Sequence, residues 1–150
     1  KIMLQRILKT RKGFDLAVLR VALGGLIFPH GAQKMLGWFG GNGWSNTLHF
    51  FTGAGHMSYI TAVFVILIEF FGSLMLITGT FTRIAALGMF GLFTGIIYNV
   101  AWPNGFFMNW GGNNHGEGFE YHLLVLGMSL ALFIAGGGSF SADSKLSSTK

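Results

Sequence analysis

Four long apolar stretches follow one another along the chain, separated by segments rich in glycine and polar residues. They span residues 16–36, 60–79, 84–102 and 119–136. An α-helix rises about 1.5 Å per residue, so a hydrocarbon core about 30 Å thick needs about 20 residues. Each stretch meets or approaches this length, and the fourth, which is short, suits a thin bilayer. The pattern predicts an all-α fold: a four-helix antiparallel transmembrane bundle.

The basic residues occupy only one set of the connecting segments. Eight of the ten Lys and Arg lie before the first stretch, between the second and third, or after the fourth: Lys1, Arg6, Lys9, Arg11, Lys12, Arg83, Lys145 and Lys150. The other connections, residues 37–58 and 103–118, contain no Lys or Arg. Because basic flanks stay on the cytoplasmic side during insertion, both termini are expected to be cytoplasmic.

Three segments are expected: a basic cytoplasmic N-terminal segment at 1–13, a four-helix membrane domain at 14–137 and a polar cytoplasmic tail at 138–150. The first suits a helix that lies on anionic lipid, and the tail is expected to fray. A signal peptide is the alternative for the N-terminus, but the first stretch is too long, contains Arg20, His30 and Lys34, and lacks a cleavage site. Within residues 37–58, Ser45 is expected to cap a short interfacial helix.

Composition supports a small membrane domain. Hydrophobic residues make up 51% of the chain and charged residues only 10%, whereas soluble domains contain about 25% charged residues. The net charge of +5 therefore reflects topology and lipid contact, and we expect no nucleic acid partner. The chain has no cysteine, which excludes thiol–disulfide exchange, cysteine-ligated zinc and iron–sulfur clusters. No metal site is predicted.

Small residues recur along single faces of the predicted helices. Gly88, Gly91 and Gly95 share a face of the third stretch with Asn99, and Gly127 lies on the face of the fourth that carries Glu120. Gly24 and Gly31 lie close to the Arg20 line of the first stretch, and Gly72 adjoins Glu69 in the second. Helices in lipid associate by close backbone approach, so these faces are expected to meet at the centre of the bundle.

Two charged residues lie well inside the apolar stretches. Arg20 is about one turn from the inner end of the first stretch, and Glu69 is near the middle of the second. Charges are costly in a bilayer and usually face one another or a cavity. We therefore predict a buried Arg20–Glu69 ion pair. Such a pair could simply pin two helices together, or it could belong to a pocket or proton path, and the sequence leaves both readings open.

A second polar cluster lies nearer the expected outer surface. His30 and Lys34 are one helical turn apart, after Pro29, and Glu120 and His122 begin the fourth stretch at about the same depth. Together they are predicted to surround a pocket with aromatic walls. The alternative is an interfacial network in which Lys34 reaches the headgroups and the histidines only form hydrogen bonds. The candidate ligand-binding residues are His30, Gln33, Lys34, Trp38, Asn99, Glu120, Tyr121 and His122.

Four sequence motifs resemble the DoxX family of membrane proteins. They are HGAQKMLGWFGG at 30–41, Glu69 followed by FFGSLMLITGTFTRIAA, GFEYHLLVL at 118–126 and GGGSFSAD at 136–143. The resemblance implies a multi-pass protein of the bacterial cytoplasmic (inner) membrane, similar to the small membrane subunit of thiosulfate:quinone oxidoreductase. Other members are tied to quinone or catechol detoxification and to thiol-oxidative stress. The family's recurring polar positions fall on Arg20, His30, Gln33, Lys34, Glu69, Glu120 and Tyr121.

Three functions follow as hypotheses. In a quinone-linked redox subunit, His30 or Lys34 would donate to a quinone carbonyl, and Glu120 or Glu69 would relay a proton. The alternatives are a non-catalytic scaffold subunit of a larger membrane complex and a small-molecule carrier. The residues supply no redox centre, so whether the chain is itself an enzyme stays open. If it is an oxidoreductase subunit, the electrons would come from a partner subunit or a bound cofactor.

Quinone is the expected cofactor, and no covalently attached cofactor is expected. A haem held by His30 and His122 is the less favoured alternative, because one histidine in each of two helices is a weak pattern. The expected partners are the lipid bilayer and other membrane protein subunits.

Overall fold

The computed structural model describes residues 2–148, which contain helices and no strand. The α-helices are α1 (Ile2–Leu8), α2 (Phe14–Leu36), α3 (Gly43–Thr52), α4 (Tyr59–Leu67), α5 (Ser73–Thr78), α6 (Thr82–Ile96), α7 (Glu120–Ala135) and α8 (Ala142–Ser148). Two π-helical turns, η2 (Ile68–Gly72) and η3 (Ile97–Ala101), extend α4 and α6. Two 3₁₀ turns, η1 (Trp38–Gly40) and η4 (Trp102–Asn104), lie in the connections.

Three helical segments are long and apolar enough to cross a membrane. They are Phe14–Leu36, Tyr59–Thr78 and Thr82–Asn104, and a shorter apolar helix covers Glu120–Ala135. The all-helical prediction is confirmed, and each apolar stretch lies within a few residues of its predicted bounds. The short fourth helix was also predicted.

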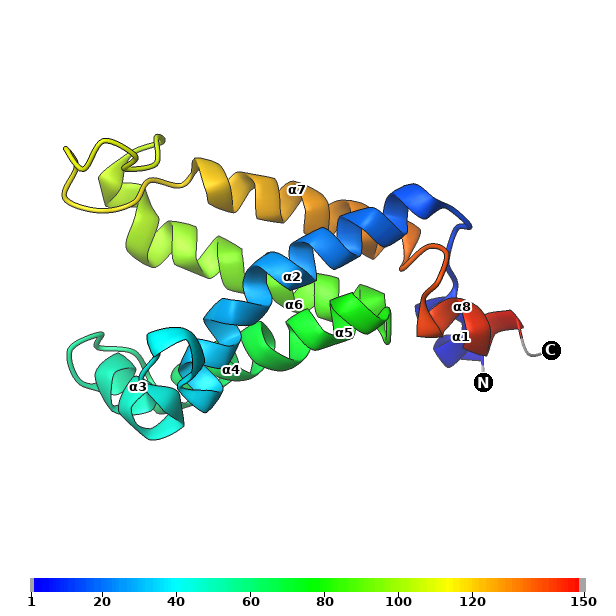
Figure 1. Ribbon diagram of the computed structural model, residues 1–150, viewed down its shortest axis with the longest axis horizontal. Coiled ribbons are helices and arrows are strands. Elements are labelled where there is room, and N and C mark those ends of the chain that lie inside the picture. The colour runs from blue at the N-terminus through cyan, green and yellow to red at the C-terminus, as the bar shows by residue number, and fades with distance from the viewer. Residues whose placement is uncertain (1, 149–150) are drawn as a thin grey trace.

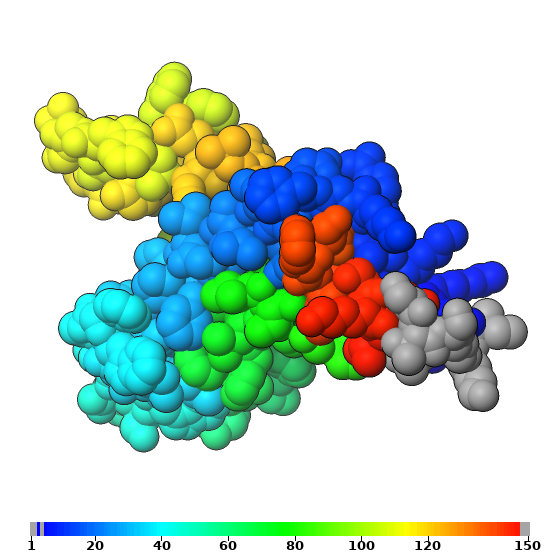
Figure 2. Space-filling model, turned by 45° about the vertical axis from the view of Figure 1, so that its right-hand side comes forward, coloured from blue at the N-terminus to red at the C-terminus, as the bar shows by residue number. Residues whose placement is uncertain are grey.

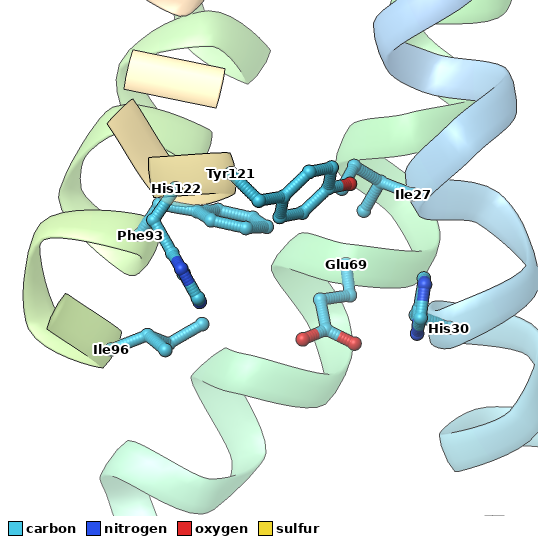
Figure 3. Close-up of a pocket in the computed structure, with 7 residues that line it drawn as sticks. All are labelled: Ile27, His30, Glu69, Phe93, Ile96, Tyr121 and His122. Carbon is cyan, nitrogen blue, oxygen red and sulfur yellow. The ribbon is translucent and has the colours of Figure 1, made fainter. Parts of the chain in front are cut away.

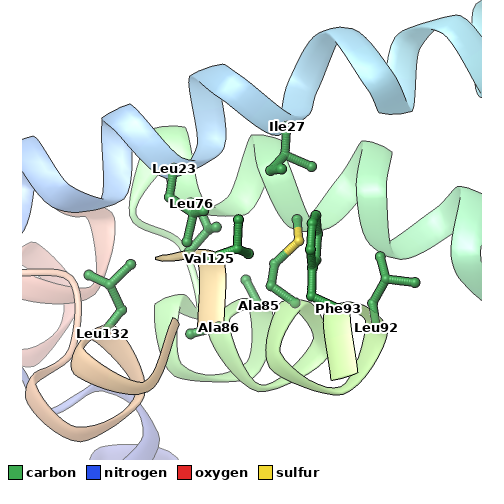
Figure 4. Packing of buried hydrophobic residues seen from close by; sticks show 10 residues of the cluster. Leu23, Ile27, Leu76, Ala85, Ala86, Leu92, Phe93, Val125 and Leu132 are labelled. Carbon is green, nitrogen blue, oxygen red and sulfur yellow. The ribbon is translucent and has the colours of Figure 1, made fainter. Parts of the chain in front are cut away.

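The apolar helices pack around one hydrophobic core. Helix α7 lies along α6, and α2 packs against α5 and η2 (Figure 1). Residues from all of these helices interdigitate, including Leu23 and Ile27 of α2, Leu76 of α5, and Val125 and Leu132 of α7 (Figure 4). Each of these five side chains is at most 2% exposed, so the centre of the packed region is dry.

The two ends of the molecule differ in shape. At one end, here called the terminal end, α1 and α8 are neighbours (Figure 1). At the other, the loop end, α3 and the segment before α7 form two separate lobes, cyan and yellow in Figure 2. The hairpin of α6 and α7 therefore diverges from α2 and α4 toward the loop end.

Glycine allows α2 to approach the second apolar segment closely. A Cβ atom on Gly31 would lie 2.6 Å from the backbone of Glu69 and Phe70, and one on Gly24 would lie 2.8 Å from the carbonyl oxygen of Ser73. These two contacts place the helices antiparallel and fix their register. The prediction for Gly91, Gly95 and Gly127 is wrong, because a Cβ at any of them would meet nothing within 4 Å.

The C-terminal tail is ordered by contacts with the α5–α6 turn. The Asp143 carboxylate, only 1% exposed, accepts hydrogen bonds from the backbone N–H groups of Phe81 and Thr82 at 2.7 and 2.8 Å. It thereby satisfies donors at the first turn of α6 that have no partner within the helix. The prediction of a frayed tail is wrong for residues 138–148, and residues 149–150 lie outside the described part.

The connections contain one predicted helix, whose predicted cap is absent, and one short turn. A short helix forms within residues 37–58, as predicted, but it is capped differently. Helix α3 begins at Gly43, so Ser45 lies inside its first turn, and Asn42 at the N-cap makes no side-chain cap bond. The turn between the second and third apolar segments is short, because α5 ends at Thr78 and α6 begins at Thr82.

Candidate functional site

Residues of four helical segments, with polar side chains from α2, η2 and α7, meet at a cavity of about 170 Å³, here called the helix cavity. It lies where the α6–α7 hairpin begins to diverge from α2 and η2. Figure 3 shows its lining residues, which are Ile27, His30, Glu69, Phe93, Ile96, Tyr121 and His122. Four of them were singled out in the sequence: His30, Glu69, Tyr121 and His122.

The predicted Arg20–Glu69 ion pair is not formed. Arg20 is 2% exposed, as expected of a buried charge, but its guanidinium donates to four backbone carbonyls. These are the carbonyls of Leu76, Ile77, Gly137 and Phe140, at 3.0, 2.5, 2.9 and 2.7 Å. The helix register explains the error, because Gly31 lies beside Glu69 and Arg20 is three turns away, level with the end of α5.

Glu69 pairs with Lys34 instead. The Nζ atom of Lys34 lies 2.5 Å from Oε2 of Glu69, and the two side chains are 23% and 7% exposed. Glu69 is held in the π-helical turn η2, a feature that often marks functional positions in helices. The pair places one carboxylate oxygen beside Lys34 while the carboxylate still lines the helix cavity.

Other predicted ligand residues line separate cavities. Gln33 and Lys34 line a cavity of about 270 Å³ beneath the first loop, here called the loop cavity. Its other lining residues are Gly40, Gly41, Asn42, Thr47, Phe50 and Phe51. Asn99 lines a groove of about 550 Å³ between α4 and the end of α6, and its side chain donates to the Gly95 carbonyl.

Trp38 and Glu120 are not part of these cavities. Trp38 is 54% exposed in η1, next to the ring of Phe39. Glu120 accepts a hydrogen bond of 3.4 Å from the indole of Trp110 in the second loop. The predicted convergence of Glu120 with His30 and Lys34 on one pocket is therefore wrong, because Glu120 points to the loop side of α7.

Aromatic rings form one wall of the helix cavity. The Phe93 ring lies 6.4 Å from that of Tyr121 and 5.7 Å from that of His122, and these last two are 5.8 Å apart. The Nδ1 atom of His122 is buried without a hydrogen bond of good geometry among the described residues, the Gly118 backbone being only a weak partner. The cavity thus combines flat apolar surfaces with an imidazole nitrogen, a phenol and a carboxylate.

This lining suits a single small ring that carries polar substituents. An apolar cavity of about 150 Å³ holds a benzene molecule, so the helix cavity has the volume for one six-membered ring. Phe93 and Tyr121 offer faces and edges for ring contacts. The phenol and the imidazoles supply donors to oxygen atoms on the ring, and Glu69 supplies an acceptor.

The sequence patterns missed the apolar half of this site. Ile27, Phe93 and Ile96 follow the ordinary helical period of buried residues, so nothing in the pattern separates them from core positions. The π-helical turns also had no signal in the sequence. Their effect is to shift the residues that follow around the helix axis, which changes which side chains face the cavity.

Comparison with known proteins adds the family. The family model described as DoxX matches residues 16–102, a segment that includes Arg20, His30, Lys34 and Glu69 and ends before α7. No curated protein and no solved structure matches the chain. The match covers more than half of the 150 residues and agrees with the three long apolar helices. The chain therefore belongs to the DoxX family of membrane proteins.

Proposed function

We propose that the protein is a multi-pass membrane protein whose four apolar helices form an antiparallel transmembrane bundle in the bacterial cytoplasmic membrane. The distribution of charge between its ends supports this proposal. The terminal end carries Arg83 and the basic residues of α1 and α8, whereas residues 37–58 and 103–118 at the loop end have no Lys or Arg. By the positive-inside rule, the terminal end is cytoplasmic and the loop end faces outward.

Within that membrane, the helix cavity binds the ring of a quinone, and the chain is a small subunit of a quinone-linked redox complex. The observation that carries this proposal is the gathering of His30, Glu69, Tyr121 and His122 around a ring-sized cavity with an aromatic wall. Tyr121 and His122 donate to the quinone oxygens, and Glu69 accepts a proton from the reduced ring. A redox partner supplies or removes the electrons.

A haem is not part of the proposal. His30 and His122 do line the same cavity, as the sequence suggested. However, its volume of about 170 Å³ is below the range of roughly 300 to 1,000 Å³ typical of sites for drug-sized ligands. A macrocycle needs more space than one ring.

A scaffold role is the second candidate, and the loop-end aromatics favour it. Trp110 is 88% exposed, Tyr98 82% and Phe107 70%. Aromatic residues are enriched in protein interfaces and at membrane surfaces, so these side chains suit contact with another membrane subunit. The two candidates are compatible if the redox partner docks at the loop end.

Binding of a short-chain benzoquinone to the purified protein tests the proposal. Tyr121→Phe and His122→Phe retain a ring of similar size and remove polar atoms, so each is expected to weaken binding about tenfold, the equivalent of one hydrogen bond. Glu120→Gln, outside the cavity, serves as the matched control and should bind normally. Isothermal titration in detergent measures all three. Unchanged affinity in both cavity variants would contradict the quinone site. If Trp110→Ala then released the protein from a larger complex, the scaffold role would remain.

A further inference from the structure

The Lys34–Glu69 ion pair lies between two cavities. Glu69 lines the helix cavity, among the apolar helices, and Lys34 lines the loop cavity, beneath the first loop. The two side chains join these spaces directly through their contact of 2.5 Å. An ion pair in this position is not needed for helix contact, because Gly31 already brings the backbones of α2 and η2 together.

The loop cavity is suited to hold water. Its lining includes the polar side chains of Gln33, Asn42 and Thr47 as well as exposed backbone at Gly40. A cavity of about 270 Å³ has room for several water molecules, each needing two to four polar partners. The Lys34 ammonium has three donors, of which Glu69 uses one, so the others can bind water there.

On the opposite side of Glu69 the packing is close and mostly apolar, and its polar groups include the buried hydroxyls of Ser73 and Ser129. Between the helix cavity and the terminal end lie Leu76, Met89 and Leu132, which are fully buried (Figure 4 shows Leu76 and Leu132). A proton moving in that direction would pass buried apolar side chains and only isolated hydroxyls, which is costly in a low-dielectric interior. The loop cavity therefore offers the polar way out of the helix cavity.

We propose that the Lys34–Glu69 pair conducts protons between the helix cavity and water at the loop end. This inference rests on the proposed function for the source of the proton. A hydroxyl of the bound ring transfers its proton to a carboxylate oxygen of Glu69, which leaves the ring oxygen anionic and Glu69 neutral. The neutral acid then releases the proton to water in the loop cavity, and the ion pair with Lys34 forms again.

The groups that face Glu69 are few and can be tested singly. Helix α2 contributes Lys34 and His30, and α7 contributes Tyr121 and His122. From α6 the cavity-lining residues are Phe93 and Ile96, which do not titrate. Of these groups, Lys34 forms the ion pair with Glu69.

A lipid-soluble carbodiimide reports this protonation, because it modifies carboxyl groups in their protonated form. In intact cells expressing the full chain, only the external pH is varied, and mass spectrometry follows the modification of Glu69. The expected rate rises by up to about tenfold for each unit of external acidification. Asp143, buried at the terminal end, is the internal control and should not respond. In Lys34→Met, the unpaired Glu69 should be modified rapidly at every pH, whereas Lys34→Arg should keep the pH response.

A rate at Glu69 that ignores external pH, or the same pH response in wild type and Lys34→Met, would overturn the proposal. Asn42→Cys, at an exposed position of the loop-cavity lining, gives an independent reading in an otherwise wild-type chain, since it introduces the only thiol. A membrane-impermeant maleimide added outside should label it, and failure to label would contradict an opening of the loop cavity to outside water. Neither assay measures quinone binding, so a failure of the proton path remains distinguishable from a failure of the quinone site.

Discussion

At the scale of single residues, the sequence predicts which charged side chains are buried but not which groups they pair with. Arg20 and Glu69 are both buried, as their positions in apolar stretches indicated. Their partners depend on the register of two helices, which Gly31 fixes through a close backbone contact. A sequence shows the glycine but not the helix that it meets, so Glu69 was assigned to Arg20 although Lys34 was within reach.

Arg20 is expected to anchor the terminal end without any energetic coupling to Glu69. Arg20→Leu removes donors from four carbonyls and should cost at least about 3 kcal/mol, because hydrogen bonds to charged groups contribute about 1.5 to 3 kcal/mol each. Thermal unfolding in detergent of Arg20→Leu, Glu69→Gln and the double variant measures the effect. The losses should add, since the side chains do not touch. If the double variant lost less stability than the sum of the two single losses, Arg20 and Glu69 would interact, which would contradict the structure.

At the scale of elements, the apolar period predicted the long helices because it is repeated over many residues. The π-helical turns, the cap that Asp143 provides and the carbonyl cluster around Arg20 all depend on contacts between distant segments. No local pattern predicts them. The glycine pattern correctly indicated close approach at Gly24 and Gly31 but failed on α6 and α7 at Gly91, Gly95 and Gly127, because small residues permit close approach but do not require it.

The two classes of glycine should respond oppositely to substitution. A Cβ on Gly31 would lie 2.6 Å from backbone atoms of η2, so Gly31→Ala should destabilise the protein by about 1 to 3 kcal/mol and disturb the Lys34–Glu69 contact. Gly91→Ala, in open space on α6, should be neutral or stabilise by up to about 1 kcal/mol. Thermal unfolding in detergent compares them. Equal losses in both variants would mean that the close α2–η2 contact is incorrect.

At the scale of the whole molecule, charge and shape agree. The basic residues gather at the terminal end, and the two loop lobes diverge at the other (Figure 2). The helix cavity lies where the α6–α7 hairpin begins to diverge from α2 and η2, so this divergence makes room for the site. The sequence predicted which polar residues come near this level of the bundle. It could not predict which of them share one cavity, because that depends on the angle between the α6–α7 hairpin and the pair formed by α2 and η2.

Orientation follows from the same charge distribution. With single cysteines introduced at Ser45, Asn113 and Ser147, a membrane-impermeant maleimide applied to intact cells should label the first two and spare the third. The reason is the orientation proposed above, in which the positive-inside rule leads us to expect the terminal end in the cytoplasm. Labelling at Ser147 alone would show that the orientation is the reverse of the one proposed, and the proton path would then lead to the cytoplasmic side.

The most direct test of the quinone site is photolabelling of the protein in its native membranes with an azidoquinone, followed by peptide mapping. A quinone site in the helix cavity should give adducts on α6 and α7 at Phe93, Tyr121 or His122. These adducts should disappear when excess unlabelled quinone competes. Adducts confined to lipid-exposed positions such as Leu124, or adducts that competitor does not reduce, would contradict a quinone site in the helix cavity.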